Sequence, residues 1–281
     1  MTRRLSILSC LLLVLLTAHP VAAQDKPPLP ASTAVPASSP VVGERYHVEV
    51  SAGLWYPAPA SIFVAGDQLG IIGTKIDGVS DLGFVKTRFG DLRIVVRPAT
   101  RHKIHIDYAP VRYQAEAILT RDVTFNGVTY HLGIPVISSL SWKSWNFGYE
   151  YDFLHRDRWF AGVIAQARWT WAEATLTSPV VAEQAQARAP VPGIGGIVRV
   201  YAARRVAVTG QLIGFKLPES VDPQKRFEGH IITWDIAGTF NFTDNVGAEV
   251  GYRSFDVDAR INPYTGSLKL GGLYFGAVGR F

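Results

Sequence analysis

The sequence predicts an all-β fold, a transmembrane antiparallel up-and-down β-barrel of about ten strands. Apolar residues recur with period 2 through most of the chain, which is typical of strands whose two faces meet different media. The segments between these strands alternate between short and long. After residue 23 no apolar stretch is long enough for a membrane helix, so a crossing of the membrane requires a closed barrel.

The 281 residues divide into three predicted parts. Residues 1–23 begin with Arg3 and Arg4, continue with an apolar run and end with small residues, which is the pattern of a secretory signal peptide. Residues 24–43 are rich in Pro, Ala and Ser and are expected to form a flexible periplasmic leader. Residues 44–281 are expected to form one barrel domain.

Composition excludes several classes of function. The single cysteine, Cys10, lies in the signal peptide, so disulfides and cysteine-held metals are excluded for the mature chain. Without Arg3 and Arg4, 26 basic residues face 23 acidic ones. This net charge of +3 is too small and too evenly spread to indicate binding to nucleic acid. We expect no cofactor and no metal.

Ten segments carry the alternation. In the first, Tyr46, Val48 and Val50 share one face, while Arg45 and Glu49 share the other. The ten predicted strands are residues 45–56, 85–98, 103–118, 136–154, 159–174, 193–202, 206–217, 229–242, 246–258 and 267–281.

The predicted connections also alternate. Short turns are expected at residues 99–102, 155–158, 203–205 and 243–245. Longer loops are expected at residues 57–84, 119–135, 175–192, 218–228 and 259–266. This arrangement is typical of membrane barrels, and an even number of strands places both termini at the rim with short turns. Within the second loop, residues 123–130 are expected to form a hairpin around Asn126-Gly127.

One strand changes phase midway. Ile104 and Ile106 are apolar at even positions, whereas Val111 and Tyr113 are apolar at odd positions. We expect a β-bulge at Pro110 to realign the two faces, because proline is tolerated at bulges.

The last strand alternates apolar residues and ends in phenylalanine. It resembles the insertion signal of bacterial outer-membrane β-barrel proteins, carried here by Leu273, Phe275, Ala277 and Phe281, although Gly279 stands where a bulkier residue is usual. Long strands, and Trp and Tyr near the ends of the apolar faces, also favour a membrane barrel over a soluble secreted barrel or sandwich. The resemblance implies a location in the outer membrane of a Gram-negative bacterium, contact with its lipid and insertion by the barrel-assembly machinery.

The face opposite the apolar one is predicted to fill the lumen with charges of both signs. Ten strands close at a backbone radius of about 10 Å, a width that Arg and Glu from opposite walls would occupy. The predicted lumen charge network is Arg45, Glu49, Asp91, Arg93, His105, Asp107, Arg112, Glu116, Glu150, Asp152, Arg168, Arg199, Asp235, Glu249, Arg253 and Arg280. Trp55 also faces inward in this register.

A closed or very narrow lumen is therefore favoured, because buried charges require partners. The expected role is structural or interactive, through long external loops whose ligand or protein partner the sequence does not identify. The first alternative is a narrow, porin-like channel for ions or small solutes, although a selective pore more often shows one dominant sign of charge.

The second alternative is an outer-membrane hydrolase or acyltransferase. The acidic and histidine side chains expected near the long-loop rim are Asp122, His131, Glu173, His230, Asp256 and Asp258. They show no motif-like spacing and no Ser-His-acid arrangement, so we expect no enzyme. His105 and Asp107 are expected to join the charge network. Asp77 and Asp81, in the first loop, are expected to be solvated rather than to hold calcium.

Overall fold

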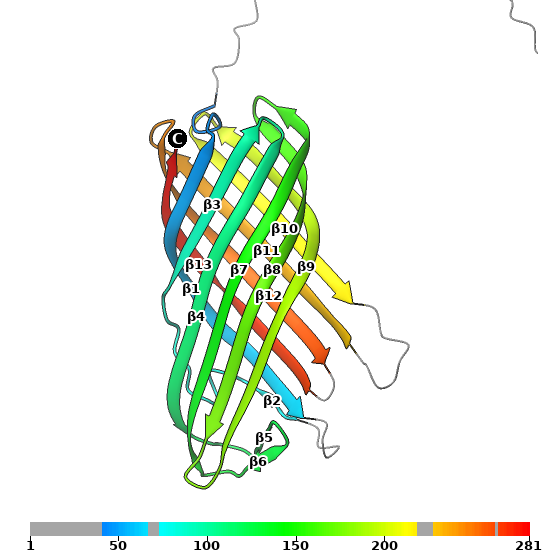
Figure 1. The fold of residues 1–281 in the computed structure, drawn as a ribbon. Helices are drawn as coiled ribbons and strands as arrows, with labels where there is room; N and C mark the ends of the chain where they lie inside the picture. Colours follow the sequence, from blue (N-terminus) through cyan, green and yellow to red (C-terminus); the bar gives the residue numbers. More distant parts are fainter. Residues whose placement is uncertain (1–40, 67–72, 218–226, 262–263) are drawn as a thin grey trace, which may run out of the picture. The chain divides into compact units, whose positions relative to one another are not determined.

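Ten long antiparallel strands close into a barrel (Figure 1). In the computed structural model, residues 41–66, 73–217, 227–261 and 264–281 are described, so the predicted signal peptide and most of the leader lie outside the described residues. The barrel strands are β1 (Val48–Gly66), β3 (Phe89–Ala99), β4 (His102–Ile118), β7 (Pro135–Arg156), β8 (Trp159–Thr177), β9 (Ala182–Ala203), β10 (Val206–Leu217), β11 (Phe227–Asn241), β12 (Val246–Ile261) and β13 (Tyr264–Arg280). Each pairs with the next along the chain, and β13 pairs with β1. The predicted fold class is confirmed.

Three short strands lie near one end of the barrel (Figure 1). β2 (Lys75–Ile76) pairs with β1, while β5 (Val123–Phe125) and β6 (Val128–Tyr130) pair with each other. Asn126 and Gly127 join β5 to β6 with φ angles of 50° and 83°. A two-residue hairpin turn favours this left-handed backbone and Asn-Gly supplies it, so the predicted hairpin is confirmed. Among the described residues, no helix is long and apolar enough to cross a membrane.

The two rims differ as predicted, but two of the predicted loops need correction. At the rim that holds the C-terminus, here called the turn end, β3–β4, β7–β8, β9–β10 and β11–β12 are joined by short turns (Figure 1). At the opposite rim, the loop end, the predicted loop 175–192 is wrong. β9 begins at Ala182 and pairs with β8 from Thr177 onward. Likewise β12 and β13 extend to Ile261 and Tyr264, which leaves little of the predicted loop 259–266.

The outward-facing residues of β7 change from apolar to polar along the strand. Phe147 and Trp145 face outward and are exposed, and two residues further toward the loop end the outward residue is Lys143. The inward residues change from polar to apolar in the same direction, from Asn146 at the middle of the strand to Trp142 on the loop-end side. The strand therefore meets apolar surroundings outside over one half and water over the other.

The neighbouring strands change at the same level. Outward Trp171 of β8 is followed by Glu173, and β9 pairs Arg188 with Trp171. We call the apolar outward zone on the turn-end side the apolar belt, and it includes Ile104, Phe147, Val163, Val198, Ile236, Val250, Leu273 and Phe275. We call the part beyond it the loop-end extension, formed mainly by residues 111–118, 135–143, 172–177 and 182–188.

This change of medium explains the phase change that the sequence shows at Pro110. β4 pairs with β7 without a register shift from His102 to Ile118, so the predicted bulge is wrong. Val111 and Tyr113 lie on the same inward face as His105 and are buried. The backbone keeps its phase, and the apolar side chains move from the outer face to the inner face where the strand leaves the apolar belt.

Candidate functional site

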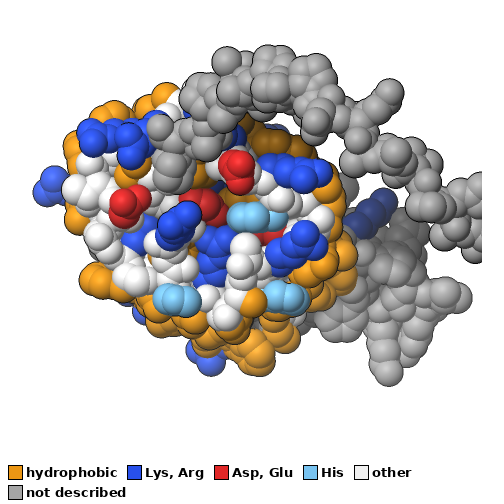
Figure 2. All heavy atoms as spheres, turned by 90° about the horizontal axis from the view of Figure 1, so that it is seen from above, with side chains coloured by type: hydrophobic (Ala, Val, Ile, Leu, Met, Phe, Trp, Pro, Cys, Tyr) orange, Lys and Arg blue, Asp and Glu red, His pale blue; other side chains and the backbone are white. Residues whose placement is uncertain are grey.

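Inward-facing side chains fill the barrel in two zones, charged toward the turn end and apolar toward the loop end. Seen from the turn end, acidic and basic side chains gather inside a ring of apolar ones (Figure 2). The structure places most of the predicted network inside the barrel, namely Glu49, Asp91, Arg93, His105, Asp107, Glu150, Asp152, Arg168, Arg199, Asp235, Glu249, Arg253 and Arg280.

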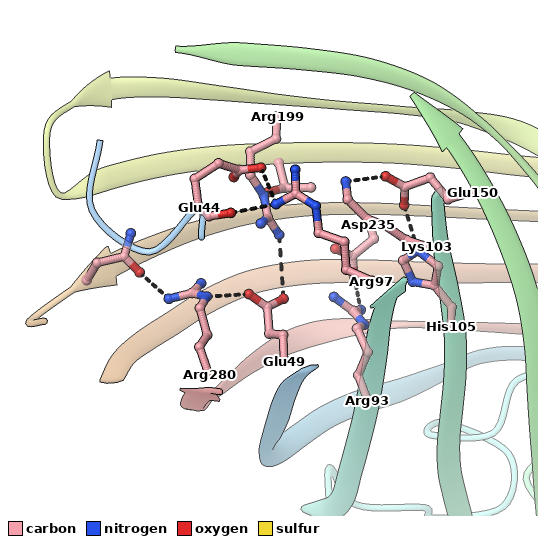
Figure 3. A network of polar contacts seen from close by, with 12 residues as sticks. Glu44, Glu49, Arg93, Arg97, Lys103, His105, Glu150, Arg199, Asp235 and Arg280 are labelled. Atoms are coloured by element: carbon pink, nitrogen blue, oxygen red, sulfur yellow. Dashed lines mark hydrogen bonds and ion pairs between the residues drawn. The ribbon is translucent and has the colours of Figure 1, made fainter. Parts of the chain in front are cut away.

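A first cluster links four strands at the turn end (Figure 3). Arg280 of β13 is 2% exposed and donates to Glu49 of β1 at 2.5 Å from its Nε. Its Nη1 donates to Oδ1 of Asn241 on β11 at 2.7 Å. Arg199 of β9 lies 3.8 Å from the second carboxylate oxygen of Glu49. The terminal strand is thereby joined to side chains from across the lumen.

The segment before β1 folds into this cluster. Glu44 pairs with Arg97 at 3.2 Å and accepts a hydrogen bond from the Tyr201 hydroxyl at 2.6 Å. Tyr46 is buried, and the guanidinium groups of Arg97 and Arg280 lie 5.4 and 5.9 Å from its ring centroid. These side chains lie together at the turn-end mouth of the barrel.

The structure corrects the register predicted for this segment. Arg45, predicted to face the lumen, is exposed, and Tyr46, predicted to face outward, is buried. The regular strand begins only at Val48, so the alternation of β1 does not extend to the residues before it.

A second cluster lies on β4 and β7. Lys103 places its Nζ 2.6 Å from Glu150 and 2.9 Å from Asp152, and the Nε2 of His105 lies 2.6 Å from the other Glu150 oxygen. The side chains of Lys103, Glu150 and Asp152 are at most 2% exposed. Lys103 also lies 3.4 Å from the ring centroid of Phe160 on β8. Both carboxyl groups thus contact the same ammonium group, and Glu150 also contacts His105.

A third cluster crosses the middle of the lumen. Arg253 of β12 pairs with Asp91 at 2.8 Å and with Asp235 at 3.0 Å. Arg93 lies 3.4 Å from Asp107 and 3.8 Å from Asp235, and Tyr274 donates to Asp235 at 2.8 Å. Charges from β3, β4, β11 and β12 therefore meet in one network.

A cavity of about 70 Å³ lies beside this third cluster. Its lining includes Arg93, Asp107, Arg168 and Arg253 on the charged side and Trp142 and Phe255 on the apolar side. The space suffices for about five water molecules, since each needs roughly 10–15 Å³. Trp55, which faces inward as predicted, also lines the cavity and donates from Nε1 to the Gly272 carbonyl at 3.2 Å.

On the loop-end side of the cavity, an apolar cluster occupies the barrel. Trp142 and Phe255 meet edge to face with centroids 4.8 Å apart, and Phe84 lies 5.5 Å from Tyr113. The cluster continues into the short strands through Ile76, Phe125 and Tyr130 and into the first loop through Leu82. β2, the β5–β6 hairpin and residues 77–84 thus supply apolar side chains to the interior at the loop end.

Asp77 and Asp81 hold the first loop in place. The backbone N–H groups of Val79 and Ser80 donate to Asp77, and Arg121 donates from Nε to Asp81 at 3.0 Å. The hydrogen bond from Arg121 holds the pKa of Asp81 below its ordinary value of 3.8. Asp81 is 6% exposed, so the expectation that this acid is solvated was wrong.

Two residues predicted for the lumen network lie outside the barrel. Arg112 and Glu116 are exposed on the outer face of the loop-end extension. Their predicted place in the lumen depends on the bulge at Pro110, which the continuous pairing of β4 and β7 excludes. Water rather than protein surrounds these two charges.

The acids and histidines predicted near the loop-end rim form separate pairs. His131 lies 3.3 Å from Asp122, and His230 lies 3.2 Å from Asp258. The nearest ligand atoms of His230, Asp256 and Asp258 lie within 4.8 Å of one another, and Asp256 also pairs with Lys269 at 3.3 Å. These side chains are half-buried or exposed, and Glu173 is exposed on the outer face of β8.

Sequence reasoning missed several members of the lumen network. Lys103 has the same parity as His105, so the alternation of β4 contained the information needed to include it. Glu44 precedes the first strand, and Asn241 and Tyr201 carry no formal charge. Alternation therefore does not mark Glu44, and charge does not mark Asn241 or Tyr201, although these two have the parity of Asp235 and Arg199.

Comparisons with known proteins agree with this architecture. No protein-family model matches the chain, and no curated protein matches it. The outer membrane protease OmpT from Escherichia coli is similar in structure, with a TM-score of 0.60 and 10% identity, over 83% of this chain and 96% of that one. Ail from Yersinia pestis covers 84% of this chain and 99% of its own at 11% identity, with a TM-score of 0.36. The toluene transporter TodX from Pseudomonas putida covers 84% of this chain and 90% of its own at 9% identity, with a TM-score of 0.33.

At such low identity, the similarity to OmpT shows the fold alone. The chain has the fold of bacterial outer-membrane β-barrels, as its resemblance to these proteins implied. The exposed apolar belt and the charged interior agree with the predicted location in the outer membrane.

Proposed function

We propose that the protein is an integral outer-membrane barrel with a sealed lumen, whose role is structural or interactive and is carried by the loop-end extension. The observation that supports it most is the filling of the lumen at two levels. The three ionic clusters occupy the half toward the turn end, and the apolar cluster occupies the other half. The cavity between them measures only about 70 Å³.

Strand length supports a role outside the membrane. β7 and β9 each have 22 residues, whereas a tilted strand crosses a bilayer with about 9–11. With the turn end in the periplasm, roughly half of each strand stands beyond the outer leaflet. This extension presents a polar outer surface, together with the loops, to any ligand or partner. Outer-membrane lipid and, during insertion, the barrel-assembly machinery are further proposed partners, and Leu273, Phe275 and Phe281 are exposed on the last strand.

Planar-bilayer recording tests the sealed lumen against the porin-like alternative. Purified protein inserted into a bilayer is expected to give no steady single-channel steps, because hydrated ions find no continuous path through paired charges and packed apolar side chains. A porin inserted by the same procedure serves as the positive control. Steady current steps of uniform size from the purified protein would contradict the sealed lumen and support the channel.

We further propose that the protein is not an enzyme. The acid–histidine pairs lie on separate elements, His131 beside β6 and His230 on β11, so the two pairs do not form one site. Hydrolase and acyltransferase assays on the purified protein are expected to give no activity. An activity that is present in the wild type and lost in His131→Ala or His230→Ala would overturn this proposal.

A further inference from the structure

A depression of about 370 Å³ lies on the outer surface of β4, β7, β8 and β9, where the apolar belt meets the loop-end extension. Strand pairing places its central residues in one row, because Lys143 pairs with Trp171 and Trp171 pairs with Arg188. The adjacent row on the belt side contains Trp145 and Tyr108. The depression therefore spans the level at which lipid headgroups would meet the barrel.

The depression carries more positive than negative charge. Lys143 and Arg188 line it together with one acid, Glu173, and Arg112 pairs in register with Ser141 of its lining. Within the described part of the chain, Lys143, Arg188 and Arg112 form no ion pair. At the loop end of β11, β12 and β13, in contrast, Lys269 and His230 are each paired with an aspartate. Three cationic groups without an ion-pair partner among the described residues therefore lie in or beside this depression.

Aromatic rings line the centre of the depression and its belt side. Trp145 stacks on Tyr108 with centroids 4.5 Å apart, and Trp145 and Trp171 are 38% and 36% exposed. Amphipathic rings at this level contact both headgroups and the upper ends of acyl chains. Further toward the turn end, the outward residues of β7 continue with Phe147 and Tyr149. An acyl chain can lie on this strip while its headgroup remains beside Lys143 and Arg188.

We propose that this depression binds a lipid of the outer leaflet through a phosphate-bearing headgroup. Lys143 and Arg188 bind the phosphate, Trp145 and Trp171 contact the upper part of the lipid, and Glu173 accepts hydrogen bonds from headgroup hydroxyls. The charges select an anionic headgroup, and the apolar strip below them selects a lipid over a soluble phosphate. The proposal rests on the membrane-spanning barrel described above.

Native mass spectrometry of the full-length mature protein tests this site. The protein in neutral detergent is titrated with phosphatidylglycerol, with phosphatidylcholine and, separately, with inorganic phosphate. The test variant is Lys143→Gln/Arg188→Gln. The matched control is Arg101→Gln/Arg156→Gln, which removes two exposed basic residues at the turn end of the same barrel wall. Both double variants change the net charge equally.

The wild type and the control are expected to bind phosphatidylglycerol more tightly than phosphatidylcholine. The test variant is expected to lose about thirtyfold in affinity for phosphatidylglycerol, since each basic residue near a lipid surface contributes roughly fivefold. Equal losses in both double variants, or equal binding of the two lipids by the wild type, would overturn the proposal. Displacement of the lipid by millimolar inorganic phosphate would reassign the site to a soluble anion.

Insertion of the same samples into lipid vesicles separates this inference from the proposed function. All variants are expected to insert and to protect their strands from protease. If the wild type inserts but binds no anionic lipid, the lipid site fails while the membrane barrel stands. If it does not insert, the proposed function itself fails.

Discussion

At the scale of single residues, several charges of the interior are buried and held by ion pairs. Lys103 pairs with both Glu150 and Asp152, and all three side chains are at most 2% exposed. An ion held in surroundings of low polarity costs several kcal/mol when its partner is removed. The same reasoning applies to Arg280 and Glu49 at the turn end.

The substitution Lys103→Met tests this dependence. It leaves two carboxylates without their cation and is expected to lower the free energy of unfolding by about 3–5 kcal/mol. Arg101→Met, in the adjacent exposed turn, is expected to change it by less than about 0.5 kcal/mol. Urea unfolding in lipid vesicles measures both values. Similar effects of the two substitutions would show that the Lys103 cluster does not stabilise the barrel.

Acid is expected to loosen the first loop through Asp81. Its pKa is lowered by the hydrogen bond from Arg121, so the stabilisation is present above the unfolded value of about 3.8 and is lost as the pH falls through the lower folded value. Pepsin cleavage near Leu82 and Phe84 measures the opening. Asp81→Asn is expected to be cleaved faster than wild type at pH 5, and the two rates are expected to converge at lower pH. A ratio that does not change with pH would contradict this assignment.

The sequence predicted single residues of the lumen wherever a strand alternates without interruption. Glu49, Glu150 and Asp235 follow directly from parity and lie inside. Arg45 and Arg112 were misplaced because one precedes the regular strand and the other follows a change of medium. The odd or even position of a residue shows which way its side chain faces only where the strand keeps its alternation on both sides of that residue.

At the scale of elements, the informative feature is that apolar side chains change faces along one strand. On β7 the outward residues are apolar at Phe147 and polar at Lys143, without any irregularity in the pairing with β4. A sequence alone cannot separate this pattern from a bulge, since both move apolar residues from one parity to the other. The first half of β9 likewise has an outward face of polar residues that meets water. Its alternation of Ala and Gln therefore resembles a loop in the sequence.

Two matched substitutions on β7 locate the edge of the membrane. Phe147 and Ile137 have the same parity and are 50% and 47% exposed, but Phe147 lies in the apolar belt and Ile137 in the loop-end extension. Phe147→Arg is expected to destabilise the inserted protein by about 2–4 kcal/mol, because arginine is costly near the bilayer midplane. Ile137→Arg is expected to change stability by less than about 0.5 kcal/mol. Equal costs in urea unfolding from vesicles would place the membrane edge elsewhere.

At the scale of the whole molecule, closure of the barrel could be predicted but the contents of its lumen only in part. Ten alternating segments and the short turns between them predict the number of strands, and the structure confirms it. The predicted ionic filling is present at the turn end. The apolar filling at the loop end was not predicted, because it draws on Leu82, Phe125 and Tyr130 from loop segments whose inward packing has no signature in the alternation.

The ionic clusters and the apolar cluster lie one after the other along the barrel. Each of them alone is therefore expected to block the passage of ions. Trp142→Ser/Phe255→Ser removes the edge-to-face pair above the cavity and is expected to remain silent in planar bilayers, since the ionic clusters stay in place. Replacement of Arg253 and Asp91, together with Arg280 and Glu49, by serine removes two of the ion pairs and is also expected to remain silent, since the apolar cluster stays in place.

Only the combination of both sets is expected to give steady current steps, because it alone leaves a hydrated path from one rim to the other. The measurement requires that all variants insert equally, which protease protection in vesicles establishes. Current from the Trp142→Ser/Phe255→Ser variant alone would show that the ionic clusters form a permeable filter rather than a seal. The porin-like alternative would then describe the lumen below the apolar cluster.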